Sequence, residues 1–137
     1  MTREENIEAA LFARAETMPF DTAKIAWPNE KKDPPSDGSL YVEVLHFPNK
    51  SDRFTLRGSG PEHMMGFLQL LVRAPKNSGR TEATIVAATL ALHFPADLKL
   101  RSEDVIVRIS KRPDVMSGSP TETSWNVPVT VYYEAFA

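Results

Sequence analysis

The sequence predicts an α+β fold in which two helices pack on one face of a mostly antiparallel sheet, within a single domain spanning residues 1–137. Three observations support this prediction. Helical periodicity occurs in only two segments, strand-like runs flank them, and the chain contains no internal repeat or linker. Its 137 residues, 42% of them hydrophobic, are enough to bury one core.

The first helix is expected over residues 3–18. Thr2 and Glu5 have the spacing of a capping box at its start, apolar residues then recur at helical intervals, and Pro19 ends the pattern. The sequence therefore places an amphipathic helix ahead of all the strands.

Two strands separated by loops are expected next. A short strand over 24–27 ends at Pro28, which cannot donate to a strand ladder, and the polar stretch 29–38 is a predicted loop. Alternating side chains predict a strand over 40–47 with one face on the core. A second loop is expected over 48–61, where turn-forming residues predominate.

The middle of the chain predicts a strand followed by the second helix. Residues 64–73 are almost continuously apolar, which is typical of a central strand buried on both faces, and a polar turn follows over 74–79. A helix is expected from Arg80 to Phe94, because Pro95 ends it. This helix is predicted to lie flat on the sheet through a wide apolar arc made of Ile85, Val86, Leu90 and Leu92.

The last strand shows the most regular alternation in the chain. Strands are expected over 105–109 and 125–135, joined by a loop over 110–124 that is rich in Pro, Gly, Ser and Thr. Pro128 lies within the last strand, and a strand that carries a proline is expected at a sheet edge or with a bulge. The last strand is therefore predicted to be half-exposed and open to a partner.

Composition argues against several classes of protein. With 18 acidic and 16 basic residues and a net charge of -2, the chain is not built chiefly to neutralise nucleic-acid phosphates. It has no cysteine, and therefore no disulfide, thiol nucleophile or cysteine-based metal site. We expect a cytoplasmic protein, because its first residues lack the features of a secretory signal and no apolar stretch is long enough to cross a bilayer.

No catalytic or cofactor-binding constellation is found. His46, His63 and His93 lack metal-ligand spacing, and residues 58–60 lack the surroundings of a nucleophilic serine. The sequence therefore predicts no catalytic residue, metal or cofactor. An enzyme or small-ligand site is an alternative only if His46, His63 and a carboxylate converge in one pocket.

Surface features favour binding or assembly. Basic residues outnumber acidic ones between positions 49 and 80, which favours contact with DNA or an acidic protein ring, although a scattered solvated surface explains the same residues. Trp27 and Trp125 carry large apolar areas that suit either a core or an interface. The candidate interface residues are Arg53, Arg57, Met116, Trp125, Pro128 and Tyr132.

Beyond these patterns, nearly the whole chain resembles the phage tail terminator proteins. The resemblance rests on the order and spacing of motifs, of which Ala26-Trp27-Pro28-Asn29 is the most specific. The others are Ile7-Glu-Ala-Ala-Leu-Phe-Ala-Arg14, Leu40-Tyr-Val-Glu-Val44, a strand centred on Gly66, Pro75-x-x-x-Gly79, a helix ending in His93-Phe94, and Trp125-Asn-Val-Pro-Val-Thr-Val-Tyr-Tyr133.

The resemblance implies a structural, non-enzymatic subunit that forms a ring, commonly of six copies, on the head-proximal end of a long tail tube. Such a ring ends tube polymerisation and offers a surface to head-completion or connector proteins. The implied partners are further copies of the chain, the tail-tube protein, a head-completion protein and DNA passing through the lumen, with no membrane. The implied location is the virion tail, after assembly in the host cytoplasm. The nearest alternative is another head-tail connector or tube component of a phage or prophage.

Overall fold

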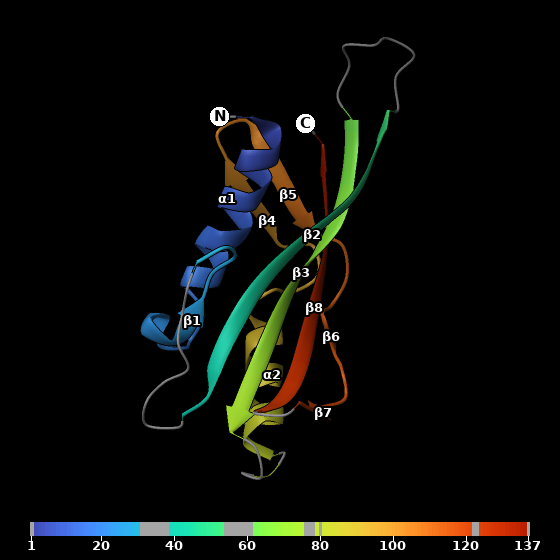
Figure 1. Ribbon diagram of the computed structural model, residues 1–137. Helices are drawn as coiled ribbons and strands as arrows, with labels where there is room; N and C mark the ends of the chain where they lie inside the picture. Colours follow the sequence, from blue (N-terminus) through green and yellow to red (C-terminus); the bar gives the residue numbers. More distant parts are fainter. Residues whose placement is uncertain are drawn as a thin grey trace.

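One curved sheet with two helices on its inner face organises the protein in the computed structural model, which describes residues 2–30, 39–53, 62–75, 79, 81–121 and 124–136 (Figure 1). The α+β class predicted from the sequence is confirmed. In chain order the elements are α1 (Arg3–Glu16), the 3-10 helix η1 (Thr22–Lys24), β1 (Ile25–Ala26), β2 (Tyr41–Arg53), β3 (Glu62–Pro75), α2 (Thr81–Leu92), β4 (Lys99–Ser102), β5 (Val105–Ile109), β6 (Asp114–Val115), β7 (Ser119–Pro120) and β8 (Ser124–Phe136).

The sheet is built around the long strands β2, β3 and β8. Hydrogen-bonded neighbours follow the order β1-β2-β3-β8-β5-β4, and β6 and β7 pair with β8 further along its length. Every pair is antiparallel except β1 with β2. Because β5, β6 and β7 together line the side of β8 that faces away from β3, β8 lies inside the sheet.

Of the two alternatives predicted for the strand that carries Pro128, an edge or a bulge, the edge is therefore wrong. Pro128 lies opposite Leu71 of β3, and its carbonyl accepts a hydrogen bond from the backbone N–H of Met116, 2.9 Å away. The N and O of one strand residue point to the same side, so the missing N–H faces the β6 side and leaves the β3 ladder intact. The segment opposite Pro128 contains one extra residue. Between the β6 pairing, which ends at Val115, and the β7 pairing, which begins at Ser119, the three residues 116–118 lie across from the two residues 127–128.

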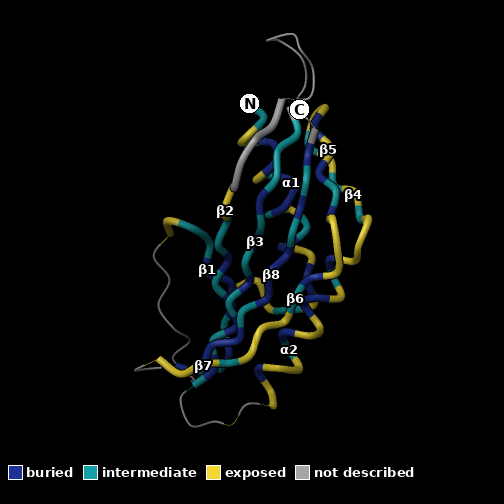
Figure 2. Tube along the Cα trace, turned by 90° about the vertical axis from the view of Figure 1, so that its right-hand side faces the viewer, coloured by how far each residue is buried: buried dark blue, intermediate teal, exposed yellow. Residues whose placement is uncertain are grey.

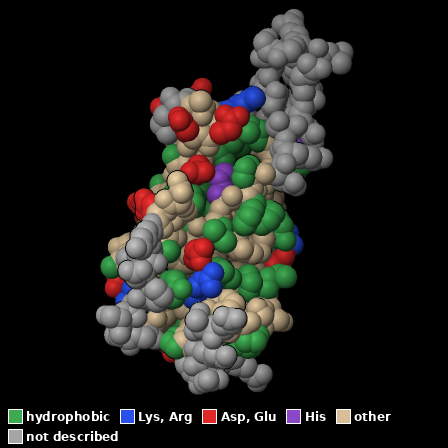
Figure 3. Space-filling model, in the orientation of Figure 1, with side chains coloured by type: hydrophobic (Ala, Val, Ile, Leu, Met, Phe, Trp, Pro, Cys, Tyr) green, Lys and Arg blue, Asp and Glu red, His purple; other side chains and the backbone are tan. Residues whose placement is uncertain are grey.

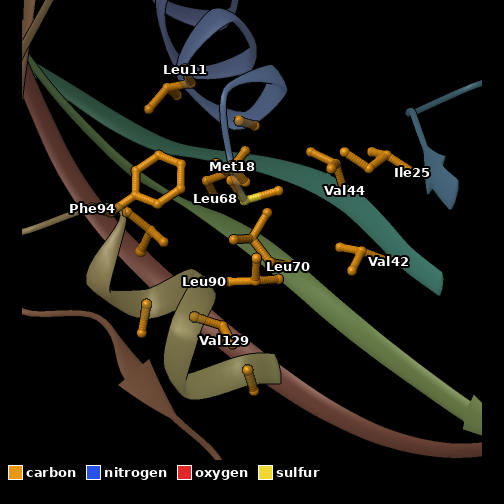
Figure 4. Close-up of a cluster of buried hydrophobic side chains, with 14 of the residues drawn as sticks. Leu11, Met18, Ile25, Val42, Val44, Leu68, Leu70, Leu90, Phe94 and Val129 are labelled. Carbon is orange, nitrogen blue, oxygen red and sulfur yellow. The ribbon is translucent and has the colours of Figure 1, made fainter. Parts of the chain in front are cut away.

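The inner face of the sheet forms the core beneath both helices. Every second residue of the long strands is buried there together with side chains of α1 and the α2 region, as Figure 4 shows. This two-residue spacing confirms the alternation predicted for the strand over 40–47 and for the inward-facing residues of the strand over 125–135. The outward-facing Asn126 and Thr130 are buried as well, so the last strand is less exposed than predicted. The fully buried side chains include Leu11, Val42, Val44, Leu68, Leu70, Leu90, Phe94 and Val129.

The predicted burial of the central strand on both faces is wrong. In β3, Leu68, Leu70 and Val72 are fully buried, whereas Phe67 and Leu71 are only half-buried. Both helices pack on the inner face of the sheet, so no described helix covers the outer side of β3.

The predicted start of α1 is confirmed, whereas the predicted buried face of α2 is partly wrong. α1 begins at the capping box, in which the Thr2 hydroxyl accepts from the Glu5 N–H and the Glu5 carboxylate accepts from the Thr2 N–H. In α2, Ile85 and Leu92 are 60% and 71% exposed, so the predicted apolar arc is wrong at both positions. Small residues allow a close approach to the sheet, and the buried face consists of Ala83, Ala87, Leu90 and Ala91. Within the described part of the chain, no helix has the length and apolar character to span a membrane.

Several predicted loops contain strands. β2 continues through Pro48 to Arg53 and shifts register between Pro48 and Lys50, so the loop predicted over 48–61 begins too early. The predicted turn over 74–79 likewise begins too early, because β3 runs to Pro75. The loop predicted over 110–124 contains β6 and β7, and β4 was not predicted, because strands of two to four residues leave almost no alternation to detect. Residues 54–61 of the loop predicted over 48–61 and residues 76–78 of the turn predicted over 74–79 lie outside the described residues. So do residues 31–38 of the loop predicted over 29–38.

Candidate functional site

The outer face of the sheet carries an aromatic row that crosses three strands. Phe47 of β2 lies opposite Phe67 of β3, which lies opposite Tyr132 of β8. The ring centroids are 4.9 Å apart in the first pair and 6.2 Å apart in the second. Phe47, at the β2 end, is 42% exposed. Hydrophobic side chains gather over β2 and β3 on the face that Figure 3 presents.

The Tyr132 end of the aromatic row is covered by a cation. Nζ of Lys111 lies 4.7 Å from the Tyr132 ring centroid and 3.1 Å from Oδ2 of Asp114. Met116, whose backbone N–H binds the Pro128 carbonyl, is exposed, so apolar surface continues from the sheet onto the segment that pairs with β8. Val115 is also exposed, but it lies opposite Val129 on the other side of the sheet.

Paired charges border the row toward β5. Oε1 of Glu134 accepts a hydrogen bond from Nε of Arg108, and Oε2 lies 2.8 Å from Nε2 of His63. Because a carboxylate only accepts, Nε2 of His63 carries the hydrogen. Arg108 also binds Asp97. The hydrogen bonds from Arg108, and next from His63, hold the pKa of Glu134 below its usual range.

A second ion pair borders the face near β1. Nε and Nη2 of Arg73 each lie 2.8 Å from Oε2 of Glu43, and Nη1 lies 3.4 Å from Oδ1 of Asn126. Arg73 belongs to the stretch in which basic residues predominate, and the sheet itself balances its charge. An apolar centre between two borders of paired charges is typical of a protein interface.

Three of the six candidate interface residues lie on or beside this face. Pro128 and Tyr132 share it with Phe67, and Met116 lies on the adjoining segment. Trp125 instead packs against the core and lies so close to Gly118 that a Cβ there would come within 2.4 Å of the indole. For Arg53 the backbone at the end of β2 is described, and Arg57 lies outside the described residues.

Sequence reasoning did not single out Phe47 and Phe67. The signal was present, because the alternation that buries Val44 and Leu68 turns Phe47 and Phe67 to the other side. What the alternation could not show is that the two rings are cross-strand neighbours, since that depends on the register of β2 with β3.

Two hollows adjoin the motif that contains Trp27 and Pro28. One, of about 440 Å³, is lined by Glu8, Phe12, Glu16, Trp27, Pro28 and Glu30. The other, of about 270 Å³, opens beside Val44 and Leu45 of β2. Trp27 packs on Phe12 with ring centroids 5.2 Å apart, so this tryptophan joins β1 to α1.

The three histidines do not converge. His46 lies on the inner face with Nδ1 3.1 Å from Glu8, and His63 lies on the outer face beside Glu134. Nε2 of His93 lies 2.7 Å from Oγ1 of Thr17, between the ends of the helices. In the ranges that the structure describes, no cluster of His, Asp and Glu side chains is suited to a metal ion. The pocket that would combine His46 and His63 with a carboxylate is not formed.

Comparisons with known proteins identify a family and similar solved structures. The model of a family described as "Phage tail terminator protein" matches residues 6–133. One solved structure is similar to this chain with a TM-score of 0.75 and 25% sequence identity, covering 96% of this chain and 94% of that chain. A comparison with curated proteins gives no match. Both matches extend over nearly the whole chain.

Proposed function

The chain belongs to the phage tail terminator family, and we therefore propose that it caps the head-proximal end of a phage tail tube, ends tube polymerisation and offers the surface for head joining. Membership of the family gives a structural role in phage tail assembly and a place in the virion tail. The observation that carries the proposal is the extent of the match, from residue 6 to residue 133.

In this proposal six copies form a closed ring through which DNA passes. A ring with rotational symmetry needs two different contact surfaces on each copy, one for each neighbour. It also needs surfaces for the tail-tube protein and for a head-completion or connector protein. The outer face supports contact with one of these partners, because Phe47, Phe67 and Tyr132 present apolar area between charges that are already paired.

Mixing the purified protein with polymerising tail-tube subunits tests the proposal. Tubes are expected to stop growing and to carry ring-shaped density at one end in electron micrographs. Unchanged growth with no density at the ends would contradict the proposal. Continuous tubes formed by the protein alone would instead support the alternative of a tube component.

A point variant and a matched control test whether the aromatic row of the outer face contributes to tube capping. Phe47→Ser removes an exposed ring of the aromatic row, and we expect it to weaken capping. Leu92→Ser removes an apolar side chain that is more exposed but lies on α2, and we expect normal capping. Equal capping by both variants would exclude a role for the row.

A further inference from the structure

The two ends of the sheet suggest how one copy contacts the next. We propose that β4 of one copy pairs with the free edge of β2 in a neighbouring copy, so that the sheet continues from copy to copy. This inference rests on the proposed function, because it names the contact that closes the ring.

The free edge of β2 is short and has clear limits. β1 pairs with β2 only at Val42 and Glu43, because the chain turns away at Pro28, which cannot donate to the ladder. At the other limit, Pro48 interrupts the edge and the register shifts beyond it. Residues 44–47 remain, and among the described strands none pairs with this edge. The hollow of about 270 Å³ beside Val44 and Leu45 leaves room there.

β4 matches this edge in length and in its availability. It spans Lys99–Ser102, four residues, as many as the free segment of β2. β4 ends the strand order, and its only strand partner in the described part of the chain is β5. Unpaired strand edges of equal length are the structures that a second chain extends through main-chain hydrogen bonds.

The two edges lie on opposite sides of the molecule. Figure 2 shows β1 and β2 along one flank and β4 along the other, in agreement with their places at the two ends of the strand order. A contact between different surfaces on opposite flanks is heterologous, and a heterologous contact repeats around a closed ring.

The side chains on the two edges are also complementary. The outer face of β4 carries Lys99 and Arg101, which are exposed and have no ion-pair partner among the residues described. In a continued sheet they lie beside Leu45 and Phe47, on the outer face of β2. The Tyr132 end of the aromatic row already has Lys111 over its ring, whereas the Phe47 end is open. A cation from β4 of the next copy covers that end in the same way.

Cysteine cross-linking tests this pairing, because the natural chain contains no cysteine. One variant combines Leu45→Cys with Arg101→Cys, which are opposite each other if the edges pair antiparallel over their full length. A second variant combines Leu45→Cys with Lys99→Cys. These two residues are opposite each other if the strands pair in parallel with a shift of one residue, which keeps the outward-facing side chains of both strands on the same face. The control combines Leu45→Cys with Leu92→Cys, since Leu92 is exposed on α2.

We expect one of the first two variants to form disulfide-linked multimers at least tenfold more than the control, both alone at high concentration and in the presence of tail tubes. The variant that reacts identifies the strand direction. If neither reacts above the control in either condition, the proposed pairing is wrong.

Tube capping by the unmodified protein is measured in parallel and separates the two proposals. Capped tubes without cross-links overturn this contact and leave the proposed function intact. Cross-linked multimers that never cap tubes support the contact and overturn the function. Charge reversal by Lys99→Glu is expected to reduce multimer formation at least fivefold, whereas Arg112→Glu, exposed on the loop after β5, is expected to leave it unchanged.

Discussion

The hydroxyl of Tyr133 lies 2.6 Å from Nε2 of His46, and this contact joins β8 to β2 over the intervening strand β3. Nδ1 of His46 lies 3.1 Å from Oε2 of Glu8, so the same imidazole also ties α1 to the sheet. A carboxylate only accepts, so Nδ1 carries the hydrogen, and in the neutral imidazole Nε2 then accepts from the Tyr133 hydroxyl. Burial, and next the negative charge of Glu8, raises the pKa of Tyr133 to about 12, which keeps this hydroxyl a donor.

Tyr133→Phe is expected to destabilise the protein by about 1–3 kcal/mol, because it leaves Nε2 of a buried histidine without its partner. The measurement is the free energy of unfolding from urea denaturation. Tyr132→Phe is the matched control, since it keeps the ring of the aromatic row, and its expected change is below about 0.5 kcal/mol. Equal losses in the two variants would show that the His46 contact adds no stability.

Gly66→Ala is expected to be strongly destabilising. A Cβ at this position would lie 2.6 Å from the Tyr133 hydroxyl and 2.7 Å from the Phe47 carbonyl oxygen, and a backbone atom cannot move aside cheaply. Overpacking of this kind costs about 1–3 kcal/mol or more. Gly79→Ala serves as the comparison, because its φ of 88° strains the backbone but nothing lies within 4 Å of the added Cβ. A smaller loss of stability at Gly66 than at Gly79, measured by thermal unfolding, would contradict the close packing.

Glu134 is expected to make stability depend on pH below neutrality. Its pKa is lowered in the folded protein by the hydrogen bond from Arg108 and then by that from His63. A glutamate in the unfolded chain has a pKa of about 4.3, so as the pH falls the unfolded chain binds the extra proton first and the stabilisation is lost.

The measurement compares the urea midpoint of Glu134→Gln with that of the natural protein at a series of pH values. The natural protein is expected to be more stable at pH 7, and the difference should shrink as the pH falls from about 5 toward 3. Glu16→Gln, which changes an exposed carboxylate, is the control and is expected to show only a small difference. A Glu134→Gln difference that stays constant with pH would rule out this linkage.

The orientation of α2 predicts opposite outcomes at two leucines. Leu90→Ala should cost about 2–5 kcal/mol, because Leu90 is fully buried against the sheet. Leu92→Ala should change the free energy of unfolding by less than about 0.5 kcal/mol, because Leu92 is exposed. Comparable losses in urea denaturation would mean that α2 is rotated from the orientation described.

The site was predictable from the sequence only in part. Alternation in the last strand placed Pro128 and Tyr132 on one face, which the structure confirms. The same alternation could not show that Phe47, far away in the chain, completes a row with Tyr132, because cross-strand neighbours depend on register. The interior position of β8 was equally hidden, since it depends on β5, β6 and β7 returning along its side.

The sequence by itself determined the features that depend on neighbours a few residues away. The capping box of α1, the end of β1 before Pro28 and the alternation in β2 and β8 are of this kind, and so is the order of motifs that resembles the tail terminator family. Tertiary structure alone decided which strand lies on the N–H side of Pro128 and which face of α2 meets the sheet. Both depend on segments distant in the chain, and the free energy of packing them together is not encoded in any short stretch of residues.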